Sequence, residues 1–113
     1  MTELLAMEWP GLSGRKYVYW IYDIGTVFAP AEGNYIFMKE VSSHTWEPVY
    51  IGQTADLHDL PENEYTMPCI RLEGATHVCV HESSEDEDVR RAEVSDLIRN
   101  YYPVCNNQPQ LDE

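Results

Sequence analysis

The amino-acid sequence predicts a small α+β domain in which an antiparallel β-sheet of three strands is flanked by helices. Three short segments have the β-branched and aromatic residues of strands, and one long segment repeats its apolar residues at helical intervals. The chain of 113 residues has no internal repeat and is long enough to bury a modest core. We therefore expect one domain over residues 1–113.

The first half of the chain predicts a hairpin. Residues 16–25 (KYVYWIYDIG) follow a turn-rich start and predict a first strand or an extended arm. Residues 34–41 predict the next strand, and residues 46–52 the one after it. Because Pro48 lacks an N–H group, the latter strand should begin there or lie at a sheet edge. The residues SSHT would join the two strands as an antiparallel hairpin.

The second half begins with a short helix and a third strand. Within residues 53–65, Thr54 is a possible N-cap and Pro61 would end the helix early. Residues 75–81 alternate as a strand does, with Val78 and Val80 on one face. The other face carries His77, Cys79 and His81. These three lack an evident fourth ligand, so we expect a polar sheet surface, exposed or facing a cleft, rather than a zinc site.

Residues 83–102 predict the main helix, which Pro103 would end. Ser84 and Glu87 have the spacing of a capping box, and acidic residues crowd the first turn, where the helix dipole favours them. The apolar residues at helical intervals predict the buried stripe, which consists of Val89, Ala92, Leu97, Ile98 and Tyr101.

The charge of the chain limits its partners. The chain has twenty acidic and seven basic residues, and the resulting net charge of −13 repels phosphate backbones. The charge fits a soluble, self-repelling cytosolic protein. It also fits a protein that binds the basic surface of a nucleic-acid-binding partner by mimicking the charge of nucleic acid. Two acidic segments, residues 56–64 and 82–88, support the second interpretation.

The cysteines predict an intracellular protein. Cys69, Cys79 and Cys105 are odd in number and widely spaced, which suits free thiols in a reducing compartment. The N-terminal residues lack the pattern of a signal peptide, and no segment reaches the length of a membrane span. We expect a cytoplasmic location.

Four motifs occur in order: GNY at residues 33–35, YIG at 50–52, RRAEVSDLI at 90–98 and YPVCN at 102–106. With the strand GATHVCVH at 74–81, this set resembles the GIY-YIG nuclease superfamily, in particular a small single-domain branch from bacteria and phages. The resemblance covers about residues 15–107, between a turn-rich arm and a frayed tail. It implies a three-stranded antiparallel sheet flanked by helices.

The resemblance also implies a site that hydrolyses phosphodiester bonds. Tyr35 and Tyr50 would position or activate the attacking water, although a free phenol has a pKa near 10. Glu93 would hold one Mg²⁺ or Mn²⁺ ion, and Asn106 would shape the pocket. The residues alone leave plainer interpretations open, namely half-buried strand tyrosines and a solvated Glu93 that pairs with Arg90.

Two positions depart from the family pattern. Leu60 stands where the family has an arginine that stabilises charge on the phosphate, a role worth roughly 10³- to 10⁵-fold in rate. Glu64 and Tyr65 stand where this branch has a pair of histidines. Arg71 is the nearest substitute cation in the sequence, and an active enzyme would recruit Arg71, Arg90 or Arg91 in place of the missing arginine.

The sequence therefore supports two functions of different classes. One is a nuclease-like protein with impaired or lost phosphodiesterase activity that binds a basic protein or a nucleic-acid-binding complex, as a phage inhibitor of a defence complex would. The other is an active Mg²⁺- or Mn²⁺-dependent DNA endonuclease, with or without a partner that supplies a basic surface. Neither function implies an oligomeric state.

Overall fold

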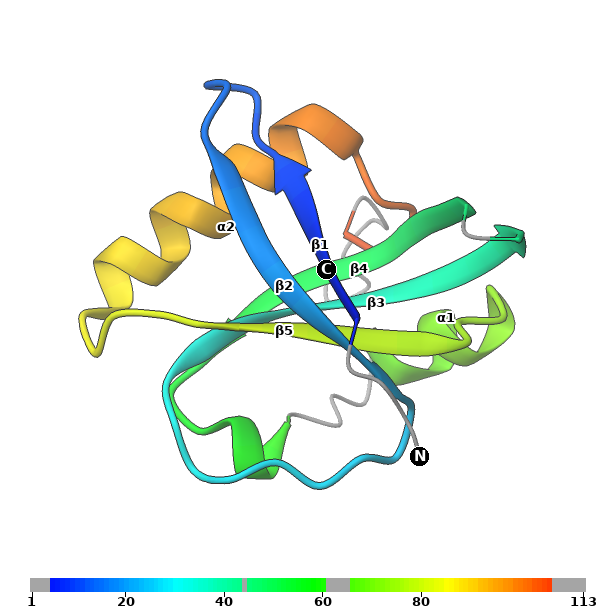
Figure 1. Cartoon of the computed structure of the whole chain (residues 1–113), viewed down its shortest axis with the longest axis horizontal. Coiled ribbons are helices and arrows are strands. Elements are labelled where there is room, and N and C mark those ends of the chain that lie inside the picture. Colours follow the sequence, from blue (N-terminus) through cyan, green and yellow to red (C-terminus); the bar gives the residue numbers. More distant parts are fainter. Residues whose placement is uncertain (1–4, 44, 61–65, 107–113) are drawn as a thin grey trace, which may run out of the picture.

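The computed structural model describes residues 5–43, 45–60 and 66–106. These residues form an α+β fold with one antiparallel sheet in the strand order β1-β2-β5-β3-β4 (Figure 1). The strands are β1 (Leu5–Pro10), β2 (Lys16–Asp23), β3 (Gly33–Ser42), β4 (Thr45–Thr54) and β5 (His77–Glu82). The helical elements are the 3₁₀ turn η1 (Leu57–Asp59) and the helices α1 (Thr66–Leu72) and α2 (Glu87–Tyr101).

The α+β class is confirmed, whereas the predicted three strands are an undercount. β3, β4 and β5 are the three predicted strands, and residues 16–25 supply β2, which pairs with β5. β1 comes from the start of the chain and pairs with β2 from Leu5–Ile21 to Pro10–Lys16. β1 is an edge strand, where a sheet tolerates a proline such as Pro10.

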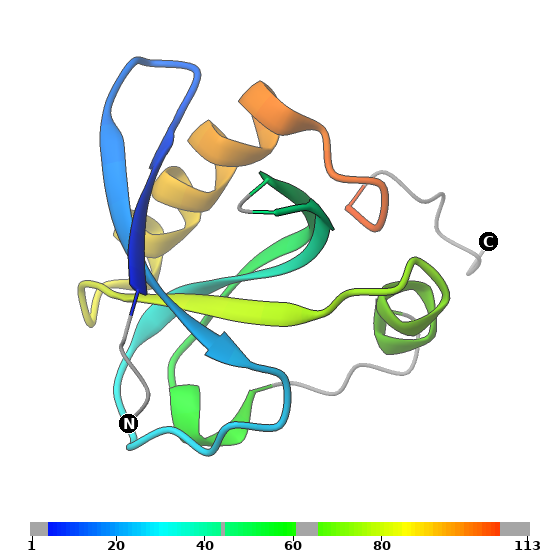
Figure 2. The ribbon, with the colours of Figure 1, turned by 45° about the vertical axis from the view of Figure 1, so that its right-hand side comes forward.

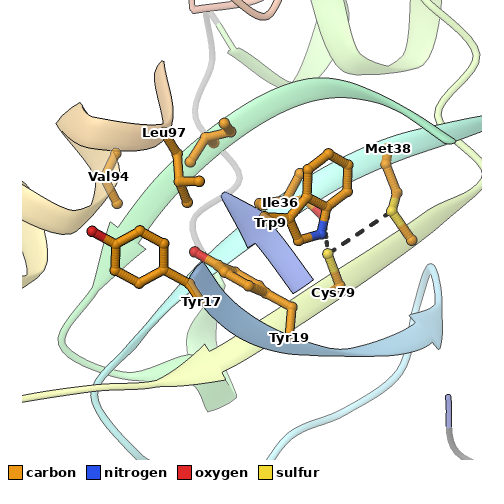
Figure 3. Packing of buried hydrophobic residues seen from close by; sticks show 9 residues of the cluster. Trp9, Tyr17, Tyr19, Ile36, Met38, Cys79, Val94 and Leu97 are labelled. Atoms are coloured by element: carbon orange, nitrogen blue, oxygen red, sulfur yellow. Dashed lines mark hydrogen bonds between the residues drawn. The ribbon is translucent and has the colours of Figure 1, made fainter. Parts of the chain in front are cut away.

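The sheet curls around α2, which lies between the β1–β2 hairpin and the β3–β4 hairpin (Figure 2). Within the described residues, no helix is both long and apolar enough to cross a membrane. The first core cluster, shown in Figure 3, fills the space between α2 and the sheet. It consists of Trp9, Tyr17, Tyr19, Ile36, Met38, Ile51, Cys79, Val94 and Leu97.

The buried face of α2 differs from the predicted stripe. Its buried residues are Arg90, Val94 and Leu97, whereas Val89 is 41% exposed. The N-cap is Asp86, whose carboxylate accepts a hydrogen bond from the Asp88 N–H at 2.9 Å. The predicted capping box at Ser84 and Glu87 is therefore wrong by two residues. The predicted stripe is confirmed at Leu97, which is buried, and at Ile98 and Tyr101, which pack against the first core cluster. It is wrong at Val89 and Ala92, which are exposed, because the hydrogen-bonded Arg90 occupies the sheet-facing side of the first turn.

The second core cluster covers the other face of the sheet, under η1 and α1. It consists of Tyr35, Phe37, Val49, Leu57, Cys69, Ile70, Val78, Val80 and Cys105. Cys69 and Cys105 form a disulfide, so the prediction of three free thiols is wrong at these two positions. Cys79 remains a free, buried thiol.

The predicted polar face of β5 is largely buried. Cys79 is 0% exposed, and burial raises the pKa of its thiol well above the ordinary value. The Cys79 thiol lies 3.7 Å from the Ile36 carbonyl oxygen, to which it donates, and 3.9 Å from the Met38 sulfur (Figure 3). The rings of His81 and Tyr19 lie 5.2 Å apart. The predicted exposed or cleft-facing surface is therefore wrong at Cys79, because β1 and β2 cover this face.

The segment after β4 also differs from prediction. Thr54 is the last residue of β4, and Asp56 caps the short turn η1 by accepting the His58 N–H at 3.0 Å. The expected helix from Thr54 is therefore a single 3₁₀ turn. Residues 61–65, which include Pro61, Glu64 and Tyr65, lie outside the described residues.

Asp96 joins α2 to the β1–β2 hairpin. Its carboxylate accepts hydrogen bonds from the Ser13 N–H at 2.8 Å, the Ser13 hydroxyl at 2.7 Å and the Tyr17 hydroxyl at 2.7 Å. These donors, Ser13 first, hold the pKa of Asp96 below its usual value. A Cβ atom at Gly11 would overlap this carboxylate, so a glycine is required there.

We expect Asp96→Ala to lower the free energy of unfolding by about 1–3 kcal/mol, because three hydrogen-bond donors lose a charged acceptor. Urea unfolding measures the change. Asp88→Ala is the matched control on the same helix and should cost less than about 1 kcal/mol. An equal loss in both variants would contradict this role for Asp96.

The pH dependence of this contribution follows from the lowered pKa of Asp96. A carboxyl whose pKa falls on folding stabilises the protein above its unfolded value of about 3.9 and loses this contribution as the pH falls through the folded value. The stability difference between the natural protein and Asp96→Asn should therefore be constant near neutral pH and shrink below about pH 4. Unfolding curves from pH 7 to pH 2.5 provide the measurement.

Candidate functional site

The two motif tyrosines lie together on the face of the second core cluster. Tyr35 on β3 pairs with Gly52 on β4, two residues after Tyr50, and the two rings are 6.2 Å apart. A Cβ atom at Gly52 would lie 2.6 Å from the Tyr35 hydroxyl oxygen and 2.9 Å from a Tyr50 ring carbon. The glycine of the YIG motif therefore makes room for both rings.

The Tyr35 hydroxyl is unsuited to act as a base. Its side chain is 4% exposed, and burial, with a smaller contribution from Tyr50, raises the pKa of Tyr35 well above its ordinary value. The group therefore stays protonated near neutral pH and can only donate or accept a hydrogen bond. Tyr35 is therefore a fully buried strand tyrosine, whereas Tyr50 is half-buried.

Glu93 lies on the opposite side of the sheet from the tyrosine pair. Its Oε1 atom accepts hydrogen bonds from Asn34 Nδ2 at 2.8 Å and from the Ser83 hydroxyl at 2.6 Å. Asn34 precedes Tyr35 in β3, so their side chains point to opposite faces. The sheet therefore separates Glu93 from Tyr35 and Tyr50.

Arg90 lies one turn before Glu93 and is 3% exposed. Its Nε atom donates to Gln53 Oε1 at 2.9 Å, and its Nη1 atom donates to the Ser84 carbonyl at 2.8 Å. Arg90 thereby holds the segment after β5 against the end of β4, instead of pairing with Glu93. The Arg-x-x-Glu motif has a structural role in this fold.

Asn106 binds the outer edge of β4. Its Oδ1 atom accepts the Ile51 N–H at 2.8 Å, and its Nδ2 atom donates to the Ile51 carbonyl at 2.9 Å. The adjacent Cys105 N–H donates to the Val49 carbonyl at 3.0 Å. Both polar groups of the Asn106 side chain therefore act as a strand partner would.

The remaining nuclease positions are also dispersed. Arg71 is exposed on α1, while Leu60 packs against the second core cluster. Of the five predicted site residues, Tyr35 and Tyr50 lie against one another, and Asn106 bonds to Ile51, the residue after Tyr50. Glu93 lies across the sheet from them and Asn106 at its edge.

A second candidate site emerges from the strand register. Gly33 pairs with Thr54 on β4 and with Glu82 on β5, so the segments next to these residues meet at one end of the sheet. The Ser83 N–H donates to the Glu32 carbonyl at 3.1 Å, and the Leu57 N–H donates to the Ala31 carbonyl at 2.8 Å. In Figure 1 the start of β3 and the turn after β5 lie at the left.

We call this region the acidic end of the sheet and define it by the acidic residues of these segments. They are Glu32, Asp56, Asp59, Glu82, Glu85, Asp86, Glu87 and Asp88. Of the two nearby arginines, Arg90 is buried and Arg91 pairs with Glu87 at 2.6 Å. The pairing of β3 with both β4 and β5 puts the segments after β4 and after β5 at the same end of the sheet, and the sequence left the pairing with β5 unspecified.

Comparison with known proteins supplies no relative. No protein-family model matches the chain, and neither a curated protein nor a solved structure matches it. Within the part of the chain that the structure describes, no three His, Cys, Asp or Glu side chains gather as a metal-binding group. The candidate sites therefore rest on their own geometry.

We expect Glu93→Ala to lower the free energy of unfolding by about 1–3 kcal/mol, because the fully buried Asn34 amide loses its acceptor. Glu93→Gln keeps an Oε1 acceptor and should cost less than half as much. Urea unfolding beside the surface control Arg99→Ala, expected within about 0.5 kcal/mol of the natural protein, makes the comparison. Unchanged stability of Glu93→Ala would argue against a structural role.

Proposed function

We propose that this chain is a binding protein for a basic macromolecule, on a nuclease-like scaffold whose phosphodiesterase activity is impaired or lost. The observation that carries the proposal is the strand register, which places Glu32 and the acidic segments after β4 and after β5 at one end of the sheet. With Arg90 turned inward and Arg91 paired to Glu87, this end presents a strongly negative surface. A basic protein, such as one that binds nucleic acid, is the complementary partner.

The positions of the nuclease residues support loss of the chemistry. A hydrolytic site needs its carboxylate and its water-positioning groups within hydrogen-bond reach of one substrate. Here Glu93 and the tyrosine pair are on opposite faces, and Leu60 offers no charge. Glu93 also receives two hydrogen-bond donors at Oε1, which favours a structural carboxylate over a ligand of Mg²⁺ or Mn²⁺.

Binding through the acidic end would follow the physics of charged surfaces. A concentrated negative surface speeds the encounter with a positive partner and orients it, and salt screens the attraction over about 10 Å at 0.1 M. The association should therefore weaken as salt rises. It should also depend on where the acidic residues lie and not only on the net charge.

The direct test compares two triple variants of equal net charge. The first replaces Asp59, Glu82 and Glu85 at the acidic end by lysine, and the second replaces Asp23, Glu47 and Glu73 outside it. With protamine as the basic probe, we expect the first variant to lose at least tenfold in affinity and the second less than threefold, measured by isothermal titration calorimetry at 0.1 M salt.

The choice of residues keeps the fold intact. Within the described residues, the side chains of Asp59, Glu82 and Glu85 make no hydrogen bond, unlike the capping residues Asp56 and Asp86. Equal losses of affinity in the two variants would mean that protamine binding depends on net charge alone. That result would reject the acidic end as a docking surface.

The nuclease alternative is tested on supercoiled plasmid with Mg²⁺ or Mn²⁺. We expect the natural protein to cleave no faster than Glu93→Gln or Tyr35→Phe, and Leu60→Arg to create no activity. A cation at position 60 would lie on the tyrosine face, away from Glu93. Cleavage that is lost in Glu93→Gln and retained in Arg99→Ala would identify an enzyme and overturn this part of the proposal.

A further inference from the structure

The segment that follows α2 covers the outer edge of β4. After the left-handed Tyr102, which ends the helix at φ 48°, the chain turns back toward the sheet (Figure 2). Cys105 and Asn106 make three hydrogen bonds to Val49 and Ile51, as described above. β4 is the last strand in the sheet order, so these residues stand where a further strand would pair.

The disulfide joins this edge segment to α1. Cys69 is 6% exposed and Cys105 is 8% exposed, and both belong to the second core cluster. α1 has only seven residues, and Leu72 at its end is 85% exposed. Cys69 and Ile70 are its described buried residues, so one of the two anchors of this short helix is a disulfide sulfur.

We propose that the Cys69–Cys105 disulfide is a redox site that controls access to the edge of β4. The oxidised form holds α1 and residues 105–106 against the strand. Reduction releases both from their covalent link, and the Ile51 N–H and the carbonyls of Val49 and Ile51 become available for pairing. The proposal does not depend on the function of the acidic end.

The chemistry is thiol–disulfide exchange with a dithiol reductant. One thiolate of the reductant attacks a sulfur of the Cys69–Cys105 bond and forms a mixed disulfide, and the other sulfur leaves as a thiolate that takes up a proton. The second thiol of the reductant then attacks the mixed disulfide and releases the protein's other cysteine as a thiol. In sum the protein disulfide gains two electrons and two protons, and the reductant becomes a disulfide.

The rest of the fold does not depend on this bond. The first core cluster contains neither Cys69 nor Cys105, and the hydrogen bonds of α2 to Asn34 and Gln53 involve neither cysteine. Its one cysteine, Cys79, is a free thiol that is fully buried with a raised pKa, so an oxidant has poor access to it. We therefore expect a local opening at β4 and not global unfolding.

Amide hydrogen exchange with and without dithiothreitol tests the proposal. On reduction, the amides of Ile51 and Cys105 should exchange at least tenfold faster, because residues 105–106 form their hydrogen bonds. The amides of Ile21 and Cys79, in the paired strands β2 and β5, should change less than threefold. Unchanged protection of Ile51, or an equal loss of protection across the sheet, would overturn the proposal.

Cysteine variants separate the roles of the three thiols. Cys69→Ser and Cys105→Ser should each show the reduced exchange pattern without dithiothreitol, whereas Cys79→Ala should still respond to it. A response to dithiothreitol that persists in Cys69→Ser would contradict the assignment. If the serine variants do not fold, titration of the natural protein with dithiothreitol, read at Ile51 and Cys79, decides the same question.

Discussion

A row of polar side chains along α2 fixes the relation of the helix to the sheet. Arg90 bonds to Gln53 on β4 and Glu93 to Asn34 on β3, while Asp96 accepts from Tyr17 on β2. Asn100 donates to the carbonyl of Pro10 on β1 at 2.8 Å. Apolar packing is tolerant of small shifts, whereas a buried polar group must meet its own partner. This row therefore determines how far the sheet curls and which strand ends meet beside the helix.

The local elements were accessible from sequence because their signals are local. Alternation identified β3, β4 and β5, and helical spacing with a final proline identified α2. The stripe on α2 was predicted correctly at its C-terminal end but not at Val89 and Ala92. There Arg90 is buried through hydrogen bonds to Gln53 and Ser84, and an apolar pattern gives no sign of this. β1 was missed because its residues stand beside turn-forming ones. Its short sequence gives little sign of a strand, and its pairing with β2 supplies the stability.

In the candidate site too, local pairing sets the placement of some residues and long-range packing sets that of others. The family resemblance implied that Tyr35 and Tyr50 share one pocket, and they lie close together because they stand on adjacent strands of one hairpin. The position of Glu93 depends on which face of the sheet α2 covers, which no pattern in the chain specifies. The disulfide likewise joins residues 36 apart in sequence, and only the packing of α1 and the final segment against the same face brings their sulfurs together.

The acidic end carries more charge than the fold requires. Asp86 caps α2, Asp56 caps η1, and Glu87 pairs with Arg91. Asp59, Glu82 and Glu85 have no such role among the described residues, and like charges brought together by the strand register repel one another and lower stability. Natural sequences keep such locally unfavourable arrangements mainly at functional sites. The same charges would be neutralised by a basic surface, which converts a cost of folding into a driving force for binding.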